Sequence, residues 1–394
     1  MFEALLATAA ALYGTATVCA WCWGRLEGGP YPSPAEADAE LDRLAEAYPS
    51  LCRVERYGHS GEGRPLRALR IGRVGAPARV LVTGQIHAVE FVSGFVARAL
   101  ARAALECAES SEDVRSLLSR AQLVVAPLLN PDGAERVWRS RGWVGVGAMR
   151  HTSAGVDPNR NFPFEGPGPK RGWNSGRSRR GTAYYRGPEP LSEPECQAVA
   201  QLAASEPFCA AVHFHSFGAV VFQPALEGVY DRGEEDPAAR GLAAFGGAFR
   251  SRQRFCAYRV IEEPPAVIAG QLDAYLLGAF GTPSVTVEVS KPGLRSLWPS
   301  RLLNPFWLSN PDDPSRWAAN DVEAALHALR AMLDATGGVP GAPRQPALGR
   351  QGSPSAGPKG AGDEPKDPDA AQHGGQAVDD EFAPTTVRGS REQP

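Results

Sequence analysis

The sequence predicts one α/β domain whose centre is a mixed, mostly parallel and twisted sheet of about eight strands, covered by helices on both faces. Three observations support this prediction. Strand-like and helix-like segments alternate between about residues 30 and 335, which is the pattern of strands joined by crossover helices. Several strand-like runs are almost continuously apolar, as expected for strands covered on both sides. The chain of 394 residues, 43% of them hydrophobic, can form one large domain or two smaller ones.

The first predicted elements are a helix and a hairpin. Residues 33–50 have helical spacing and stop at a proline. Residues 52–58 and 66–72 alternate apolar and polar side chains, and the sequence GHSGEGRP (58–65) that joins them is typical of a turn.

Four apolar runs indicate buried strands, and three further segments indicate helices. The predicted strands cover residues 79–85, 122–129, 209–216 and 283–290. A crossover helix is expected over 91–105, and the last helix from about Ser315 to Leu333. Another helix is expected after Ser192, whose side chain is predicted to cap it while Glu195 reaches back to the cap residue.

The two ends of the chain differ from this central part. Residues 1–29 are an apolar segment, in which Ala4 to Gly24 carry no charge over roughly the length of a membrane span or signal sequence. No Lys or Arg precedes that run, so a signal, an anchor and a buried helix all stay open. Export or membrane association would follow from the first two, and a cytoplasmic protein from the third. Residues 337–394 are rich in Gly and Pro and are predicted to be a disordered tail.

Composition excludes some classes of partner and structure. The formal net charge is −3, so no broad basic field indicates nucleic-acid binding. The seven cysteines have no regular spacing, which argues against a disulfide framework. Cys19 and Cys22 form a lone CxxC that is more typical of small apolar packing than of a zinc ribbon.

Polar side chains follow the predicted strands at their carboxyl ends, where active-site residues of such sheets collect. His87 follows the first buried strand, the sequence NPDG (130–133) follows the second, and His215 and Glu288 lie at the ends of the other two. His87 and Glu90 are three residues apart at a strand-to-helix junction, so both can face one point, and His215 can supply a third ligand. Two histidines and a glutamate are a known hydrolytic zinc set. Glu288 would then be a non-ligand carboxylate suited to general-base work.

Each of these signals is weak by itself. A glutamate three residues after a histidine is also common at an ordinary helix start. His213 and His215 share one face of their strand, and we expect His213 to be a hydrogen-bonded core histidine. Glu288 could be the buried partner of an arginine, although a carboxylate inside an apolar strand is costly and needs a reason.

A second cluster lies in the sequence GVDPNRNFP (155–163). Arg160 offers a bidentate fork for a carboxylate, and Asn159 can add an amide donor. Arg150, ten residues earlier, is a further cation that could stabilise an oxyanion. The alternative is a structural arginine that pairs with Asp157.

Taken together, these motifs resemble those of the zinc carboxypeptidases, the carboxypeptidase A-like family. The resemblance extends from about Tyr31 to Leu333 and rests on ordered motifs: GHSGEGRP (58–65), IHAVE (86–90), NPDG (130–133), GVDPNRNF (155–162), SEPE (192–195), HFHSFG (213–218) and TVEVS (286–290). The sequence GVDPNRNFP and the spacing from Arg150 to Arg160 look most like the bacterial branch that includes murein peptide amidases. The resemblance implies a carboxypeptidase-like fold and makes residues 30–336 the expected catalytic domain.

The resemblance also implies roles for individual residues. His87, Glu90 and His215 would bind one zinc ion per chain. Glu288 would act as general base on zinc-activated water and then as general acid, so that a C-terminal peptide bond is hydrolysed. Arg150 would polarise the scissile carbonyl, with Arg141 and Arg139 as competing candidates. Asn159 and Arg160 would hold the terminal carboxylate. Leu272, in the segment AGQLDAY (269–275), falls where the family sets side-chain preference and suggests an apolar or neutral substrate side chain.

One departure from the family pattern and one basic sequence bear on the substrate. The family usually carries a mobile tyrosine before that pocket segment, whereas this chain reads EEPPAVIAG (262–270); Tyr258 and Tyr275 are near but out of place. The sequence KRGWNSGRSRRG (170–181) is strongly basic, which is usual for a solvated loop but also makes an acidic substrate conceivable.

Three functions are therefore compared. The first is a zinc metallocarboxypeptidase, the second a murein-peptide (γ-D-glutamyl) amidase on the same fold, and the third a non-catalytic binding module. The expected partner is a peptide or murein-peptide substrate, and a membrane only if residues 4–24 form an anchor. A monomer is expected.

Overall fold

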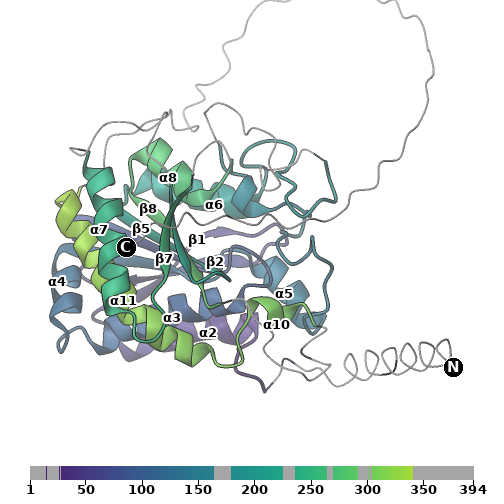
Figure 1. Ribbon diagram of the computed structural model, residues 1–394, viewed down its shortest axis with the longest axis horizontal. Coiled ribbons are helices and arrows are strands. Elements are labelled where there is room, and N and C mark those ends of the chain that lie inside the picture. The colour runs from purple at the N-terminus through teal and green to yellow at the C-terminus, as the bar shows by residue number, and fades with distance from the viewer. Residues whose placement is uncertain are drawn as a thin grey trace, which may run out of the picture. The chain divides into compact units, whose positions relative to one another are not determined.

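An eight-stranded mixed sheet is the centre of the described part of the chain (Figure 1). The structure, a computed structural model, describes residues 15, 26, 28–163, 179–224, 236–263, 269–291, 301 and 304–339. The strand order is β1-β2-β4-β3-β5-β8-β6-β7. Helices lie on both faces of this sheet, so the predicted fold class is confirmed.

The strands pair in both directions. They are β1 (Cys52–His59), β2 (Pro65–Ile71), β3 (Ala78–Thr83), β4 (Ala121–Ala126), β5 (Ala210–Ser216), β6 (Val220–Pro224), β7 (Arg259–Glu263) and β8 (Ser284–Val289). The pairs β3–β4, β3–β5, β5–β8 and β6–β7 are parallel. The pairs β1–β2, β2–β4 and β6–β8 are antiparallel. The parallel centre therefore places the carboxyl ends of β3, β5 and β8 side by side.

The helices connect these strands and cover them. They are α2 (Pro34–Ala47), α3 (Phe91–Glu106), α4 (Glu112–Arg120), α5 (Pro131–Arg139), the short 3-10 helix η1 (Pro158–Arg160), α6 (Pro194–Ser205), α7 (Pro237–Arg252), α8 (Leu272–Phe280), α10 (Phe306–Ser309) and α11 (Pro314–Thr336). The two strands of the predicted hairpin, the four buried strands and the helices expected near 33–50, 91–105 and 315–333 are all present, with ends shifted by a few residues.

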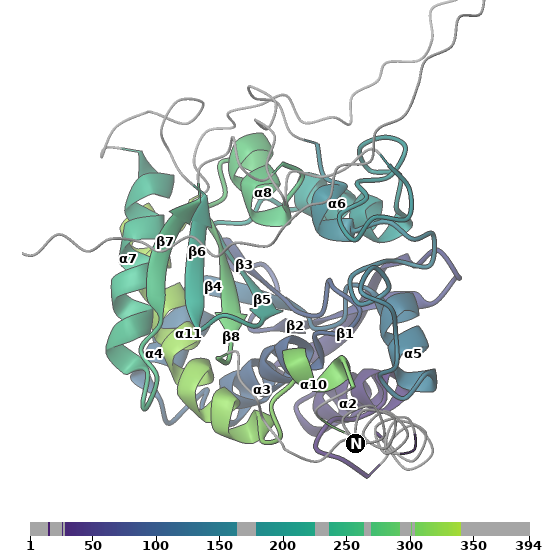
Figure 2. The same ribbon diagram turned by 45° about the vertical axis from the view of Figure 1, so that its right-hand side comes forward.

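Alternate side chains of the central strands belong to two separate hydrophobic clusters. Val80 and Val82 of β3 pack with the cluster that contains α3 and α11, whereas Leu81 between them packs with the cluster that contains α6 and α8. Figure 2 shows α6 and α8 on one side of the sheet and α3 and α11 on the other. Because side chains alternate along a strand, a sheet between two helix layers has to be apolar at nearly every position. This explains the continuous apolar runs in the sequence.

Local capping follows the sequence at one helix and departs from it at another. Ser33 caps α2, and its hydroxyl accepts a hydrogen bond from the backbone N–H of Glu36 while the Glu36 carboxylate accepts one from the backbone N–H of Ser33. The capping box predicted at Ser192 is wrong, because α6 begins at Pro194 with Glu193 as the cap residue and no side-chain cap. Ser192 instead donates to the Glu193 carboxylate. Glu195 instead accepts from the backbone N–H of Gly61 in the β1–β2 turn. For Glu195, a tertiary partner has therefore replaced the local one.

Several predictions concern residues that the structure does not describe. Nearly all of the N-terminal segment 1–29, including Cys19 and Cys22, lies outside the described residues, and so does the tail from residue 340 onward. Within the described ranges no helix is both long and apolar enough to cross a membrane. The five cysteines in those ranges are free thiols.

Candidate metal centre

Three strands of the parallel centre bring the predicted metal-binding residues and Glu288 to one end of the sheet. β3 ends at Thr83, and a turn that includes His87 and Glu90 leads into α3. His215 lies in β5 and pairs in register with Glu288 of the neighbouring strand β8. The carboxylate of Glu90 makes no capping bond to α3, and Asn310 accepts the hydrogen bond from the backbone N–H of Val92. The Glu90 side chain is therefore available to the histidines.

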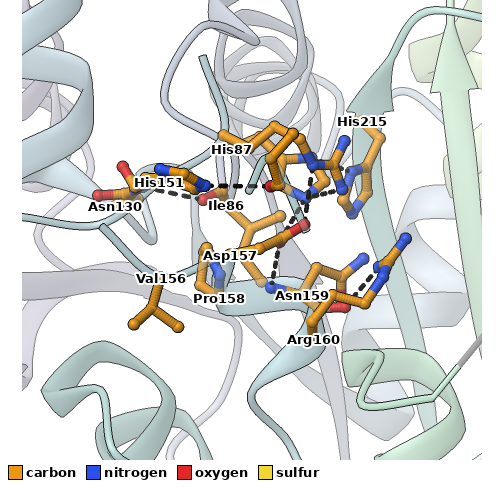
Figure 3. A network of polar contacts seen from close by, with 12 residues as sticks. Ile86, His87, Asn130, His151, Val156, Asp157, Pro158, Asn159, Arg160 and His215 are labelled. Carbon is orange, nitrogen blue, oxygen red and sulfur yellow. Dashed lines mark hydrogen bonds and ion pairs between the residues drawn. The ribbon is translucent and has the colours of Figure 1, made fainter. Parts of the chain in front are cut away.

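His87, Glu90 and His215 form a compact buried group, and Figure 3 shows the two histidines of this group. Their ligand atoms all lie within 4.8 Å of one another. The Nδ1 atoms of the two histidines are 3.2 Å apart. The Glu90 carboxylate lies 2.7 Å from Nδ1 of His87 and 3.2 Å from Nδ1 of His215. Two imidazole nitrogens and a carboxylate thus converge on one point.

This group fits a divalent cation by its chemistry. Neutral imidazole nitrogens and a carboxylate oxygen are the donors that zinc takes in hydrolytic sites. Two acceptor nitrogens and a carboxylate in such close contact repel one another unless a proton or a cation lies among them. Oε2 of Glu90 is buried and makes no hydrogen bond within the described ranges. This oxygen lies 3.2 Å from Nδ1 of His215 without a hydrogen bond, and a metal ion bound between the two atoms would satisfy it.

The far side of His87 contacts two charged residues of the 150–157 segment. Nε2 of His87 lies 3.3 Å from Oδ1 of Asp157 and 2.8 Å from Nη2 of Arg150. An N–H at Nε2 can donate to Asp157 and leaves the lone pair of Nδ1 for a metal, as is usual for metal-binding histidines. A bare Nε2 can instead accept from Arg150, and Nδ1 then carries the proton. The two contacts therefore need different tautomers, and the metal-binding tautomer is the one that Asp157 favours.

Charge complementarity sets the ionisation of the buried carboxylates. Burial alone would raise the pKa of Glu90, but His87 and His215 hold it well below its usual value. Burial would likewise raise the pKa of Asp157, whereas Arg150, His87 and Arg160 hold it far below the normal range. Burial lowers the pKa of His215 despite the neighbouring Glu90. The site therefore combines ionised carboxylates with a neutral His215, which is the state that a metal requires.

Of the three arginines considered for the oxyanion, Arg150 lies at the metal-binding group. Its Nε donates to Oδ2 of Asp157 at 2.8 Å, and its side chain is 22% exposed. Asp157 and Glu90 raise the pKa of Arg150 although burial opposes them. Arg139 is 73% exposed on α5 and pairs with Glu135. The geometry thus places Arg150 beside His87.

The 3-10 helix η1 carries the other predicted substrate-binding residues. The side-chain oxygen of Asn159 accepts a hydrogen bond from the backbone N–H of Leu272 (2.9 Å), so η1 is joined to the start of α8. Nη1 of Arg160 donates to the carbonyl of Asn159. The backbone of Gly270 packs directly on that of Arg160, and a Cβ at Gly270 would lie 2.3 Å from the Arg160 carbonyl oxygen. Leu272 itself is only 2% exposed and belongs to the α6/α8 cluster.

Two residues without a predicted role join the separate parts of this site. The side-chain amide of Asn130, the cap residue of α5, donates to the carbonyls of Ile86 and His151, so it links the His87 turn to the Arg150 segment (Figure 3). Arg136 of α5 donates to the carbonyls of Ala148, His151 and Thr152. The motif NPDG marked Asn130 as a polar strand end, but nothing in the sequence identified its partners.

His213 and the two displaced tyrosines are structural. His213 lies 2.7 Å from both the Thr83 and the Ser284 hydroxyl groups, and burial lowers its pKa to about 3, so it is the core histidine that we expected. The hydroxyl of Tyr258 donates to Asp321, and the ring of Tyr275 stacks on Phe162. Residues 164–178 and 264–268 lie outside the described ranges. They include most of the basic sequence at 170–181 and most of the sequence at 262–270 that lacks the tyrosine.

Comparisons with known proteins agree with this architecture. A model of the zinc carboxypeptidase family matches residues 37–310. Carboxypeptidase B of Astacus astacus is 34% identical over 176 residues, which are 42% of this chain and 53% of that protein. Carboxypeptidase B of Helicoverpa zea is 28% identical over 296 residues, 69% of this chain and 65% of that protein. The chain thus spans about half to two thirds of the length of these curated relatives.

Solved structures show the same fold at lower identity. Carboxypeptidase A from Helicoverpa armigera superimposes with a TM-score of 0.59 at 21% identity, and the match covers 78% of this chain and 73% of that one. A metallo-carboxypeptidase from Burkholderia cenocepacia gives a TM-score of 0.55 at 20% identity over 77% of this chain and 70% of that one. At such identities the likeness concerns the fold alone.

Proposed function

The chain belongs to the zinc carboxypeptidase family, and on that premise we propose that it is a zinc-dependent metallocarboxypeptidase that hydrolyses a C-terminal peptide bond. One observation carries the proposal: His87, Glu90 and His215 converge from two strand ends on one point, with Arg150 beside His87 and Glu288 on the strand next to His215. A metal site, a cation and a further carboxylate are the parts that amide hydrolysis by a metallopeptidase needs.

In this proposal His87, Glu90 and His215 hold the zinc ion. Zinc, when bound, supplies a Lewis acid that lowers the pKa of water and polarises a carbonyl. Asp157 fixes the metal-binding tautomer of His87 by accepting from its Nε2, at the contact of 3.3 Å. The ion would also neutralise the close approach of the two imidazoles and the carboxylate.

Glu288 and Arg150 act on the reacting groups. Glu288 lies on β8 in register with His215, so its carboxylate accepts a proton from the attacking water and passes it to the nitrogen of the leaving amine. Arg150 donates to the carbonyl oxygen of the scissile bond while negative charge develops there. Its pairing with Asp157 directs the guanidinium toward the metal-binding group.

Arg160 and Asn159 make the enzyme an exopeptidase, because they bind the terminal carboxylate of the substrate. Arg160 is 6% exposed, so an ion pair with a carboxylate there would be shielded from water and strong. The side-chain oxygen of Asn159 accepts from Leu272, which leaves its amide N–H groups to donate to substrate. Leu272 would favour an apolar or neutral C-terminal side chain.

Zinc analysis of variants tests the metal site. His87→Ala is expected to lose bound zinc, because one of three ligands is removed. His327→Ala is a matched control, because His327 lies on α11 and pairs with Asp113, away from the metal-binding residues. Equal zinc content in wild type and His87→Ala would contradict the ligand assignment.

Kinetic measurements test the reaction. Glu288→Gln should keep zinc and lose several orders of magnitude in kcat, since Gln cannot accept the proton of water. A near-normal rate would overturn the role of Glu288. Peptides with free C-termini should be cleaved much faster than the same peptides with amidated C-termini. Equal rates would exclude Arg160 as the carboxylate anchor.

The same assay distinguishes a carboxypeptidase from a murein-peptide amidase. The sequence GVDPNRNFP and the spacing from Arg150 to Arg160 suggest the amidase as the alternative. Rapid hydrolysis of murein tripeptide, with slow hydrolysis of ordinary peptides, would favour that alternative. A zinc-loaded protein that hydrolyses neither substrate would be the non-catalytic binding module.

A further inference from the structure

One aromatic ring contacts both cations of the site. The guanidinium carbon of Arg150 lies 4.9 Å from the centroid of the Tyr184 ring, and that of Arg160 lies 5.5 Å from the same centroid. Both distances are within the range of a favourable cation–π contact. Tyr184 is half-buried and belongs to no motif that the sequence singled out, so this shared contact is visible only in the tertiary structure.

The segment that carries Tyr184 is attached to the residues around Arg150. The backbone N–H of Asp157 donates to the carbonyl of Tyr185 at 2.7 Å. Nε2 of His151 lies 3.1 Å from the carbonyls of both Thr182 and Ala183. These contacts join residues 182–185 to both ends of the 151–157 segment. The position of the ring is therefore determined by the same segment that determines the position of Arg150.

We propose that Tyr184 is a positioning residue that holds the Arg150 and Arg160 side chains in the arrangement the reaction needs. The inference rests on the proposed function, in which one arginine polarises the scissile carbonyl and the other binds the terminal carboxylate of the same residue. Two cations in one site repel each other and have long, flexible side chains. The negative face of an aromatic ring attracts both and reduces the number of rotamers that they occupy. Asp157, which is ion-paired with Arg150, neutralises part of the same charge.

Three variants separate the ring from its hydroxyl and from general packing. Tyr184→Leu removes the aromatic face and keeps an apolar side chain, whereas Tyr184→Phe keeps the face and removes only the hydroxyl. Phe255→Leu is the matched control. The Phe255 ring also lies under an arginine, Arg316, at 4.5 Å, but packs on Trp317 and not on the site. Phe255→Leu therefore shows how the loss of an arginine–aromatic contact outside the site affects each measurement.

Two readouts are measured for each variant. The first is the modification rate of individual arginines by phenylglyoxal, which reacts with guanidinium groups, followed by peptide mapping with the exposed Arg254 as internal reference. We expect Tyr184→Leu to raise the rate at Arg150 and Arg160 severalfold, and Tyr184→Phe and Phe255→Leu to leave it unchanged. The second is peptide hydrolysis, in which Tyr184→Leu should lower kcat and raise KM, with kcat/KM reduced by about tenfold. Tyr184→Phe should retain most of kcat/KM.

A double variant shows whether Tyr184 acts through the arginines. In an Arg160→Gln background, Tyr184→Leu should no longer raise KM, because the residue whose position it controls is gone. The inference is overturned if Tyr184→Leu leaves arginine reactivity and kcat/KM at wild-type values. It is also overturned if Tyr184→Phe loses as much activity as Tyr184→Leu, or if the KM effect persists without Arg160. Arginine modification does not need turnover, so a wild-type protein that is inactive but shows the expected modification pattern contradicts only the proposed function.

Discussion

Substitution of Gly270 tests whether the position of Arg160 depends on close backbone packing between these two residues. A Cβ added at Gly270 would lie 2.3 Å from the carbonyl oxygen and 2.6 Å from the carbonyl carbon of Arg160. Both contacts are with backbone atoms, so no side-chain rotation can relieve them. The two segments have to separate by roughly 1 Å to reach ordinary contact distances.

The loss of stability in Gly270→Ala can be estimated by comparison with Gly63→Ala. Gly270 has φ +80° and Gly63 has φ +81°, but a Cβ at Gly63 meets no atom within 4 Å. In Gly63→Ala the left-handed backbone costs about 1 kcal/mol, and the smaller entropy of the unfolded chain offsets part of this. In Gly270→Ala the steric overlap adds about 1–3 kcal/mol. We therefore expect Gly270→Ala to be destabilised by about 2–4 kcal/mol, and Gly63→Ala by at most about 1 kcal/mol.

The functional consequence should be specific to the carboxylate site. A displacement of roughly 1 Å at Arg160 is expected to reduce kcat/KM between about tenfold and 100-fold, mainly through KM, while zinc content stays normal. Urea unfolding, zinc analysis and peptide hydrolysis are measured for both alanine variants. Equal stability and equal kcat/KM in Gly270→Ala and Gly63→Ala would refute the reasoning, because backbone strain is the same in both and only the contact with Arg160 differs.

Two further predictions concern ionised groups. Asp157→Asn should weaken zinc binding by about 10-fold to 100-fold in a competition with a chelator, because the neutral amide stabilises the metal-binding tautomer of His87 less well; an affinity within about twofold of wild type would contradict this. Glu195→Gln should remove a pH dependence of stability. Burial raises the pKa of Glu195 from 4.5 to about 7. Between these two pH values the folded state therefore binds more protons than the unfolded state. The stability that this carboxyl contributes below about pH 4.5 is lost as the pH rises through about 7. Glu195→Gln keeps the acceptor for Gly61. It should match wild type near pH 4 and be more stable by about 1–3 kcal/mol at pH 8; equal denaturation midpoints at pH 8 would be incompatible with the raised pKa.

The fold could be predicted to a useful level because its main signals are local. The runs at 79–85 and 122–129 are apolar at successive positions, and β3 and β4 are covered by helices on both faces. Helix ends were predicted less well. The structure shows a capping box between Ser33 and Glu36, whereas the capping box predicted at Ser192 is wrong because Glu195 finds its partner in the distant β1–β2 turn. A local motif cannot reveal a competing tertiary partner.

Some contacts of the candidate site could likewise be predicted from the sequence, and others could not. His87 and Glu90 are close in sequence, and a turn at the end of a strand is enough to bring them together. The convergence with His215 could be inferred only through the rule that the ends of parallel strands meet. Asp157 was considered as a partner of Arg160, whereas the structure shows it between Arg150 and His87. This arrangement depends on how the 150–157 segment packs against His87, which no spacing in the sequence specifies.

The sequence by itself determined the fold class, the family and the residue types available at the strand ends, because hydrophobic periodicity and short motifs act over a few neighbouring residues. Only the tertiary structure decided which of those residues meet. It placed Arg150 rather than Arg139 beside His87, buried Tyr258 against Asp321 and Tyr275 against Phe162, and brought Tyr184 against two arginines more than twenty residues distant in sequence. Contacts of this kind depend on the packing of loops on a completed sheet, and loop packing has no periodic signature in sequence.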